Sequence, residues 1–194
     1  KLKSIVNNGG AGIGILGIYK RNNIEYVIKS LNKKYSNNEK FRTEVAISLH
    51  IHKNKHKCSS GSNFIIDVKD FIETKNYIHL VMEKFTSDLY DFNVKYSNIL
   101  SETIKKRISL EILLGVNCLH TMGIVHGDLK PENIFISYTK SGKIINIDRI
   151  VIADFDCSKL KNITDVICST PDFMPPELKY NLSNASYASD VYTI

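Results

Sequence analysis

The segment HGDLKPEN, residues 126–133, holds the side chains in this sequence that are best suited to catalysis. Asp128 and Asn133 are five residues apart, so one loop can aim both at a common point, and Lys130 lies between them. A carboxylate beside a lysine and a carboxamide can accept a hydroxyl proton, neutralise a phosphate and help to hold a metal ion. In the alternative interpretation Asp128 only caps a polar turn, but the length and specificity of the HxDxKxxN string favour the chemical role.

The elements that must position this loop are a long helix before it and β-prone runs after it. Ser101 is a favourable N-cap for the helix, and apolar residues from Ile104 to Leu119 recur with helical spacing until a break near Gly123. Short β-prone runs follow at residues 134–136 and 150–152. We therefore expect residues 126–133 to form a loop at a boundary between two lobes.

The first third of the chain has the pattern of strands and turns around one helix. Ser36 and Glu39 form a capping box, which predicts that the helix starts there, with Phe41, Val45 and Leu49 as its apolar stripe. A strand-rich first part and a helical second part predict an α+β fold of two lobes. The β-prone runs of the first part are residues 5–6, 18–19, 24–28, 68–72 and 77–82.

The 126–133 string resembles the catalytic loop of the protein kinases, and other segments of the chain extend the resemblance. The family has a strand lysine after a Gly-rich loop, and residues 26–29, YVIK, supply Lys29. The resemblance implies that Lys29 binds the α- and β-phosphates of ATP and pairs with a helix glutamate. Of the two glutamates on the predicted helix, Glu39 falls on the solvated face and Glu44 at the edge of the buried stripe, so we expect Glu44 to be the partner.

The Gly-rich loop can be aligned with the family in two registers. We prefer the register in which Asn7 stands at the first glycine of the family's GxGGxG pattern, because a literal GxGxxG starting at Gly12 leaves too little chain before Lys29. Glycines let backbone N–H groups approach phosphates without a Cβ in the way. The residues expected to contact the phosphates are Asn7, Asn8, Gly9, Gly10, Ala11, Gly12 and Gly14.

Residues 80–85, LVMEKF, resemble the strand and hinge that hold adenine in this family. The resemblance implies that Met82 borders the adenine pocket and that the Glu83 carbonyl and the Phe85 amide bind the base. Asp88 stands where the family often has a ribose ligand. An edge strand that runs into a polar loop is the alternative interpretation of the same residues.

Two later segments complete the resemblance. Residues 154–156, DFD, stand where the family has DFG, which implies that Asp154 and Asn133 are the ligands of Mg2+. Residues 169–177, STPDFMPPE, resemble the end of an activation segment, and Thr170 is expected near Asp128 and Lys130. This threonine and Lys130 together favour Ser/Thr substrates over Tyr.

The resemblance thus implies an ATP- and Mg2+-dependent Ser/Thr protein kinase that transfers phosphate to protein hydroxyls. The implied fold is bilobal α+β, with a β-rich N-lobe over residues 1–83 and a mainly helical C-lobe over residues 84–194. The C-lobe is expected to be incomplete, because the chain stops just inside the helix that begins near Asp190. This helix braces the catalytic loop in the family.

Two departures from the family pattern keep other functions open. Gly127 replaces the arginine before the catalytic aspartate, so switching by an activation-loop phosphate is in doubt. Asp156 replaces the last glycine of DFG and is expected to adopt the backbone angles of glycine only with strain. HGD and DFD also resemble the motifs of aminoglycoside- and choline-kinase-like enzymes that phosphorylate small molecules. The third candidate is a pseudokinase that binds nucleotide without catalysis.

Composition and charge exclude several classes of protein. A sequence that is 43% hydrophobic and 24% charged is neither a disordered tail nor a collagen-like repeat. The net charge of +6 comes mostly from lysine and does not require a nucleic-acid partner. We expect no membrane partner, because no apolar run reaches the length of a membrane span. Without a CxxC pair or a visible targeting signal, we expect free thiols and an intracellular location, cytoplasmic or nuclear.

Overall fold

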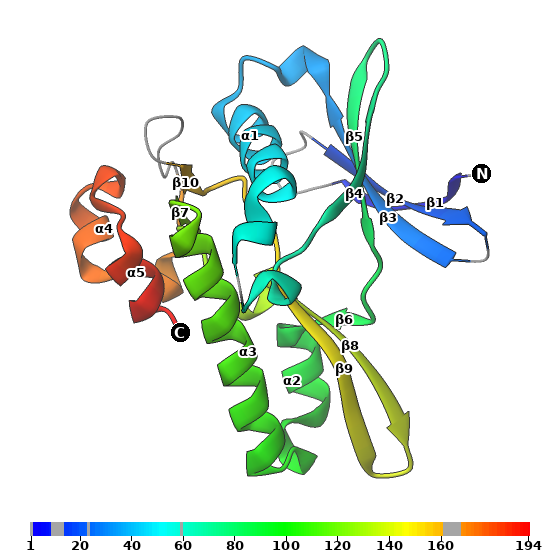
Figure 1. The fold of residues 1–194 in the computed structure, drawn as a ribbon, viewed down its shortest axis with the longest axis vertical. Coiled ribbons are helices and arrows are strands. Elements are labelled where there is room, and N and C mark those ends of the chain that lie inside the picture. Colours follow the sequence, from blue (N-terminus) through cyan, green and yellow to red (C-terminus); the bar gives the residue numbers. More distant parts are fainter. Residues whose placement is uncertain (1, 9–13, 23, 59, 161–167) are drawn as a thin grey trace.

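The computed structural model of the chain describes residues 2–8, 14–22, 24–58, 60–160 and 168–194. Its first part is a five-stranded sheet in the order β1-β2-β3-β5-β4, and all neighbouring strands in it are antiparallel (Figure 1). At the tight turn after β2, Asn22 has a φ of 51°, a left-handed conformation that asparagine tolerates. The strands are β1 (Leu2–Asn8), β2 (Gly14–Arg21), β3 (Ile24–Asn32), β4 (Val68–Glu73) and β5 (Tyr77–Glu83).

The helix α1 (Glu39–Asn54) packs on this sheet through Phe41, which joins Leu31 of β3 and Leu80 of β5 in a buried cluster. The predicted capping box is wrong, because the N-cap is Asn38, whose side chain accepts a hydrogen bond from the Lys40 N–H at 2.9 Å. The predicted stripe is also wrong at Leu49, which is 36% exposed. The buried face instead follows the 3.6-residue repeat through Phe41, Thr43, Glu44, Ile47, Ser48 and Ile51.

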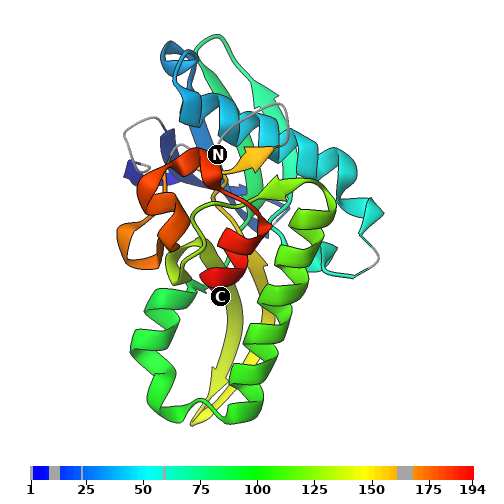
Figure 2. The same ribbon diagram turned by 90° about the vertical axis from the view of Figure 1, so that its left-hand side faces the viewer.

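Among the residues that the structure describes, the second part of the chain contains the remaining helices and two small sheets (Figures 1 and 2). Ser101 caps the long helix as predicted, since its Oγ accepts a hydrogen bond from the Ile104 N–H at 3.3 Å. The helices are α2 (Leu89–Tyr96), α3 (Glu102–Thr121), α4 (Pro176–Tyr180) and α5 (Tyr187–Tyr192). The strands are β6 (Ser87–Asp88), β7 (Ile124–Val125), β8 (Ile134–Ser141), β9 (Ile144–Ile152) and β10 (Lys159–Leu160).

The strands β8 and β9 form an antiparallel hairpin that is longer than the two predicted runs. We expected only residues 134–136 and 150–152, yet the outer half of β9 also buries Ile145 and Ile147, each 6% exposed. At the inner end of the hairpin, Ile134 and Ile136 of β8 and Ile150 and Ile152 of β9 are at most 3% exposed. The hairpin therefore anchors the 126–133 loop, which precedes β8, and Asp154, which follows β9.

A single buried cluster connects the two parts of the molecule. Ile47 and Ile51 of α1 belong to the same cluster as Leu119 of α3 and Ile150 of β9, and all four are at most 1% exposed. Burial of these side chains stabilises the position of α1 relative to the helical part. The last strand of the five-stranded sheet ends at Glu83, and the lobe boundary between residues 83 and 84 stays a prediction.

The four cysteines form two disulfides, Cys58–Cys118 and Cys157–Cys168, so the expectation of free thiols is wrong. The sequence separations of 60 and 11 residues gave no sign of these pairs. Folding brings Cys58, after α1, against α3, and it brings Cys168 back to Cys157. No helix among the described residues is long and apolar enough to span a membrane.

Candidate active site

Lys29 lies at the centre of an ion cluster built from three distant segments. The middle strand β3 holds it, in register with Leu16 of β2 and Leu80 of β5. Its Nζ atom is 2.8 Å from Glu44 Oε2 and 2.8 Å from Asp154 Oδ1. Glu44 comes from the buried face of α1, and Asp154 follows β9, so the contact between Lys29 and Glu44 that we expected is present.

The charges of this cluster alter the pKa of all three groups. Burial opposes the charged form of Lys29, but the attraction of Glu44 and Asp154 outweighs it and raises the Lys29 pKa. Burial raises the pKa of Glu44 to about 7, against the opposing effect of Lys29. The Lys29 ammonium lowers the pKa of Asp154, whose side chain is 42% exposed. One cation thus faces two carboxylates, and burial of Glu44 and the charge of Lys29 beside Asp154 move the pKa values of the two groups in opposite directions.

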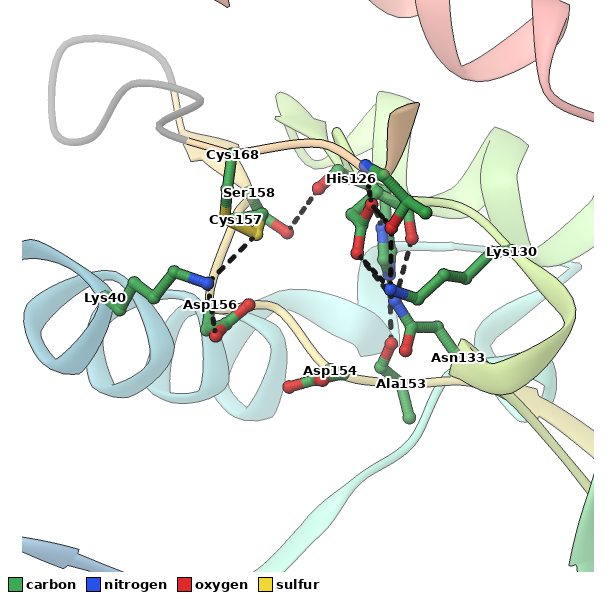
Figure 3. Close-up of polar contacts among 12 residues, drawn as sticks. Lys40, His126, Lys130, Asn133, Ala153, Asp154, Asp156, Cys157, Ser158 and Cys168 are labelled. Carbon is green, nitrogen blue, oxygen red and sulfur yellow. Dashed lines mark hydrogen bonds and ion pairs between the residues drawn. A yellow bond between two sulfur atoms is a disulfide. The ribbon is translucent and has the colours of Figure 1, made fainter. Parts of the chain in front are cut away.

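The loop at residues 126–133 surrounds Asp128 with donors, and Figure 3 shows Lys130 and Asn133 of this loop side by side. Asp128 Oδ1 accepts hydrogen bonds from the Thr170 N–H at 2.6 Å and from Thr170 Oγ1 at 2.7 Å. Lys130 Nζ is 2.9 Å from Asp128 Oδ2 and donates to Thr170 Oγ1 at 2.7 Å. Asn133 Nδ2 donates to the Asp128 backbone carbonyl at 2.8 Å. The structure therefore brings Asp128, Lys130, Asn133 and Thr170 together.

The donors around Asp128 keep it ionised. Burial opposes ionisation, yet hydrogen bonds from Lys130 and Thr170 and the charge of Lys130 hold the Asp128 pKa below its ordinary value. The residue is 8% exposed, so little water competes with these donors. The result is a carboxylate that can accept a hydrogen bond or a proton throughout the neutral range.

Asp190 of α5 braces the backbone of the 126–133 loop. Its Oδ2 accepts a hydrogen bond from the His126 N–H at 2.9 Å, and its Oδ1 accepts one from the Gly127 N–H at 3.0 Å. His126 is fully buried, and its ring bonds to the Ala153 carbonyl at 3.0 Å. Gly127 has a φ of 80°, a left-handed conformation that glycine adopts without a Cβ clash. The glycine in place of arginine thus suits the local backbone.

The Asp154–Phe155–Asp156 segment differs from the strained arrangement that we expected. Among the described non-glycine residues, Asn22 and Asp154 have a positive φ, and that of Asp154 is 64°. Asp156 is not one of them, so the prediction of backbone strain at Asp156 is wrong. Its side chain instead pairs with Lys40 of α1, whose Nζ is 3.2 Å from Asp156 Oδ2 (Figure 3).

A cavity of about 360 Å3 lies beside the Lys29 cluster and extends to the predicted hinge. Its walls are largely apolar, with Leu16, Val27 and Met82 among them, and its charged end contains Lys29 and Asp154. This combination suits a planar apolar group attached to an anionic tail. Of the predicted nucleotide ligands, it is lined by Lys29, Glu44, Glu83, Phe85 and Asp88, and of the predicted metal ligands by Asn133 and Asp154.

Some predicted nucleotide ligands have other contacts or cannot be placed. Asp88 lines the cavity, but it is also the N-cap of α2 and accepts a hydrogen bond from the Asp91 N–H at 2.8 Å. Asn7 and Asn8 end β1, and Gly14 begins β2. The other predicted residues of the Gly-rich loop, residues 9–12, lie outside the described residues.

Three features of the site were missed by sequence reasoning. Lys40 contacts Asp156 across 116 residues of sequence, and the Cys157–Cys168 disulfide lies beside it. Arg149 of β9 forms an ion pair with Glu83 of the predicted hinge. A basic residue in the first turn of a helix, or an arginine in a polar strand, is also typical of a solvated surface. The sequence holds no signal that separates such a surface residue from one that contacts the site.

These features define a class of protein. A five-stranded antiparallel sheet carries a lysine that pairs with a glutamate from α1. The helical part carries the loop with Asp128, Lys130 and Asn133, and Asp154 lies beside it as a candidate metal ligand. This is the arrangement of a protein kinase catalytic domain. The chain belongs to that family, because the protein kinase domain family matches it over residues 1–194.

Curated relatives agree with the family. The chain is 32% identical to a probable serine/threonine-protein kinase fhkB of Dictyostelium discoideum, over 91% of the chain and 15% of that protein. It is 30% identical to myosin light chain kinase A of the same organism, over 92% of the chain and 58% of that protein. A serine/threonine-protein kinase H1 homolog of Pinctada fucata is 32% identical over 79% of the chain and 34% of its own length. The chain therefore spans less than two thirds of each of these relatives.

The family uses ATP and Mg2+, and the residues of the cavity fit both. A lysine ammonium has three N–H donors, and Lys29 directs its charge to two carboxylates at the polar end of the cavity. Asp154 and Asn133 line that end and offer a carboxylate and a carboxamide oxygen, the hard ligands that Mg2+ prefers. Because the Asn133 amide nitrogen faces Asp128, the oxygen of the same amide is the atom available to a cation.

Proposed function

We propose that this chain transfers the γ-phosphoryl group of ATP to Ser or Thr hydroxyls of protein substrates. The observation that carries this proposal is the contact of Thr170 with both Asp128 and Lys130 at 2.7 Å. It joins the segment before the Pro–Pro–Glu motif to the carboxylate that would accept the hydroxyl proton. The small-molecule phosphotransferases considered above lack a comparable segment, so this contact favours a protein substrate.

Each residue of the site has a definite role in this proposal. Lys29 binds the α- and β-phosphates through the N–H donor that does not bond to Glu44 or Asp154. Asp128 orients the substrate hydroxyl and accepts its proton, and Lys130 stabilises negative charge on the γ-phosphate oxygens. Asn133 and Asp154 would hold Mg2+, which would supply positive charge to the phosphates of ATP. Thr170 holds Asp128 and Lys130 in position.

The remaining nucleotide contacts belong to the same proposal. The Glu83 carbonyl and the Phe85 amide would bind adenine, and Asp88 would bind the ribose. Asn7, Asn8, Gly14 and residues 9–12 would cover the phosphates. The support for the hinge residues is that all three line the cavity of about 360 Å3 whose other end contains Lys29.

A transfer assay tests the proposal. The full chain is incubated with Mg2+ and ATP labelled at the γ-phosphate, and with either a basic protein rich in Ser and Thr or an aminoglycoside. We expect label on serine and threonine of the protein and its loss in Asp128→Asn, while the exposed control Asp91→Asn retains activity. Transfer only to the aminoglycoside would support the small-molecule alternative. Nucleotide binding without transfer to either acceptor would support the pseudokinase.

Partners and location are finer parts of the same proposal. The substrate would be a protein that presents a Ser or Thr hydroxyl, with no nucleic-acid or membrane partner. An intracellular location, cytoplasmic or nuclear, no longer has support from free thiols, because the cysteines are in disulfides. Its remaining support is the need for ATP as the phosphoryl donor.

A further inference from the structure

The Cys157–Cys168 disulfide joins two segments that contact the candidate active site (Figure 3). Cys157 is three residues after Asp154, which pairs with Lys29. Cys168 is two residues before Thr170, which bonds to Asp128. The disulfide therefore links the nucleotide side of the site, at Asp154, to the acceptor side, at Thr170, across a sequence separation of 11 residues.

The surroundings of this disulfide differ from those of the other one. Cys58 and Cys118 are 8% and 1% exposed, and both belong to the main buried cluster. Cys157 is also buried, at 4%, but Cys168 is half-buried and is the more exposed residue of this pair. Lys40 Nζ lies 3.7 Å from Cys157 Sγ. This ammonium favours the departure of Cys157 as a thiolate in disulfide exchange, and the Asp156 carboxylate, which lies within 4.8 Å of both sulfurs, opposes it.

We propose that Cys157 and Cys168 form a reversible thiol–disulfide site, oxidised by a hydroperoxide and reduced by a dithiol, whose disulfide promotes phosphoryl transfer to protein substrates. The regulatory part rests on the proposed function. The disulfide ties residues 168–170 to the segment that contains Asp154. The contacts of Thr170 with Asp128 and Lys130 are then formed with less loss of chain entropy. Reduction removes this restraint and leaves the nucleotide cavity intact.

Reduction proceeds by two exchange steps. A thiolate of the dithiol attacks Cys168 Sγ, the S–S bond breaks, and its electron pair stays on Cys157 as a thiolate beside Lys40. The second thiol of the reductant then attacks the mixed disulfide and releases Cys168 as a thiolate. The reductant becomes a disulfide, so two electrons pass to the protein sulfurs.

Oxidation reverses this change with a hydroperoxide as the electron acceptor. The Cys157 thiolate attacks the peroxide, the O–O bond breaks, and a sulfenic acid and an alkoxide or hydroxide form. The Cys168 thiol then displaces the sulfenic oxygen as water, which forms the S–S bond. The two thiols lose two electrons, and the peroxide gains them.

The experiment measures thiol state and activity in the same samples of the full chain. One sample is treated with a dithiol and the other with hydrogen peroxide. Free thiols are alkylated and assigned by mass spectrometry, and kcat/KM is measured with a peptide that contains one serine. We expect the dithiol to open Cys157–Cys168 before Cys58–Cys118 and to lower kcat/KM for the peptide about three- to tenfold. Peroxide should restore it.

Two further measurements separate the possible outcomes. The double variant Cys157→Ser, Cys168→Ser keeps the buried Cys58–Cys118 disulfide. It should have the activity of the dithiol-treated wild type and should respond to neither reagent. The affinity for an ATP analogue should change less than twofold in all samples. A response that persists in this variant, or equal activity of both forms of the wild type, would overturn the regulatory part. If neither the oxidised nor the reduced chain transfers phosphate, the proposed function and the regulatory part both fail. If the dithiol does not open Cys157–Cys168, the reversible thiol–disulfide site is overturned and the proposed function is not affected.

Discussion

The nucleotide side and the acceptor side of the site both place one lysine against carboxylates, but they are built differently. On the nucleotide side, Lys29 meets Glu44 and Asp154, which come from α1 and from the segment after β9. On the acceptor side, Lys130 meets Asp128 of the same loop, and Thr170 is the distant member. The first cluster depends on the packing of α1, whereas the second is largely local.

This difference separates the chemical roles of the two clusters. Burial raises the pKa of Glu44, so the nucleotide side is sensitive to pH near neutrality. Donors lower the pKa of Asp128, so the acceptor side keeps its charge. Changes in the first cluster should affect nucleotide binding, and changes in the second should affect transfer.

The largest expected effect follows from Asp128→Asn. The amide cannot accept a proton from the substrate hydroxyl, so kcat for a serine peptide should fall about a thousandfold. Initial rates at saturating ATP measure this change. A fall of less than tenfold would remove Asp128 from the chemistry, and a thermal unfolding curve is the check that the variant is folded.

Lys29→Met should have the next largest effect, and it should appear in nucleotide affinity. Loss of a charge-assisted contact with phosphate is expected to weaken binding of an ATP analogue about ten- to a hundredfold. Lys29→Met leaves the buried Glu44 without its cationic partner. Lys29→Arg is therefore the second variant, because it keeps a positive charge at this position. Affinity unchanged in Lys29→Met would show that the cluster does not bind nucleotide.

Thr170→Val tests the distant member of the acceptor side. Valine has a similar shape and keeps the backbone N–H bond to Asp128, but it loses the hydroxyl between Asp128 and Lys130. We expect kcat/KM for a peptide to fall about tenfold with little change in nucleotide affinity. Thr170→Ser restores the hydroxyl and should restore most of the activity. Equal losses in both variants would contradict this role of the hydroxyl.

The smallest expected effect is a pH dependence from Glu44. Its folded pKa of about 7 lies above the ordinary 4.5, so the folded chain binds a proton more tightly than the unfolded chain does. The stabilisation that this proton gives is complete below about pH 4.5 and is lost as the pH rises through about 7. Lowering the pH from 8 to 6 should therefore protonate Glu44, remove one partner of Lys29 and weaken nucleotide binding about threefold.

Glu44→Gln is the control for this pH effect. The amide cannot ionise, so nucleotide affinity and unfolding free energy in this variant should lack the component that titrates near pH 7. Binding and urea unfolding at several pH values measure both. Identical pH profiles for the wild type and Glu44→Gln would contradict the role of Glu44.

The sequence predicted the local parts of the fold and the site better than the distant ones. The 126–133 loop and the Ser101 cap follow from short patterns, and helix geometry was enough to choose Glu44 over Glu39. The N-cap of α1, Asn38, was missed because Ser36 and Asn38 are both favourable capping residues and lie two positions apart. Lys40 and the disulfides depend on contacts between segments far apart in sequence, for which one sequence has no local signal.

Nucleotide binding belongs to the Lys29 cluster and transfer to the Asp128 cluster, and calorimetric titration with a non-hydrolysable ATP analogue separates these two roles. Asp128→Asn should bind the analogue within about twofold of the wild type, while Lys29→Met should bind it at least tenfold more weakly. Equal loss of binding in both variants, with both folded, would show that the roles are not divided.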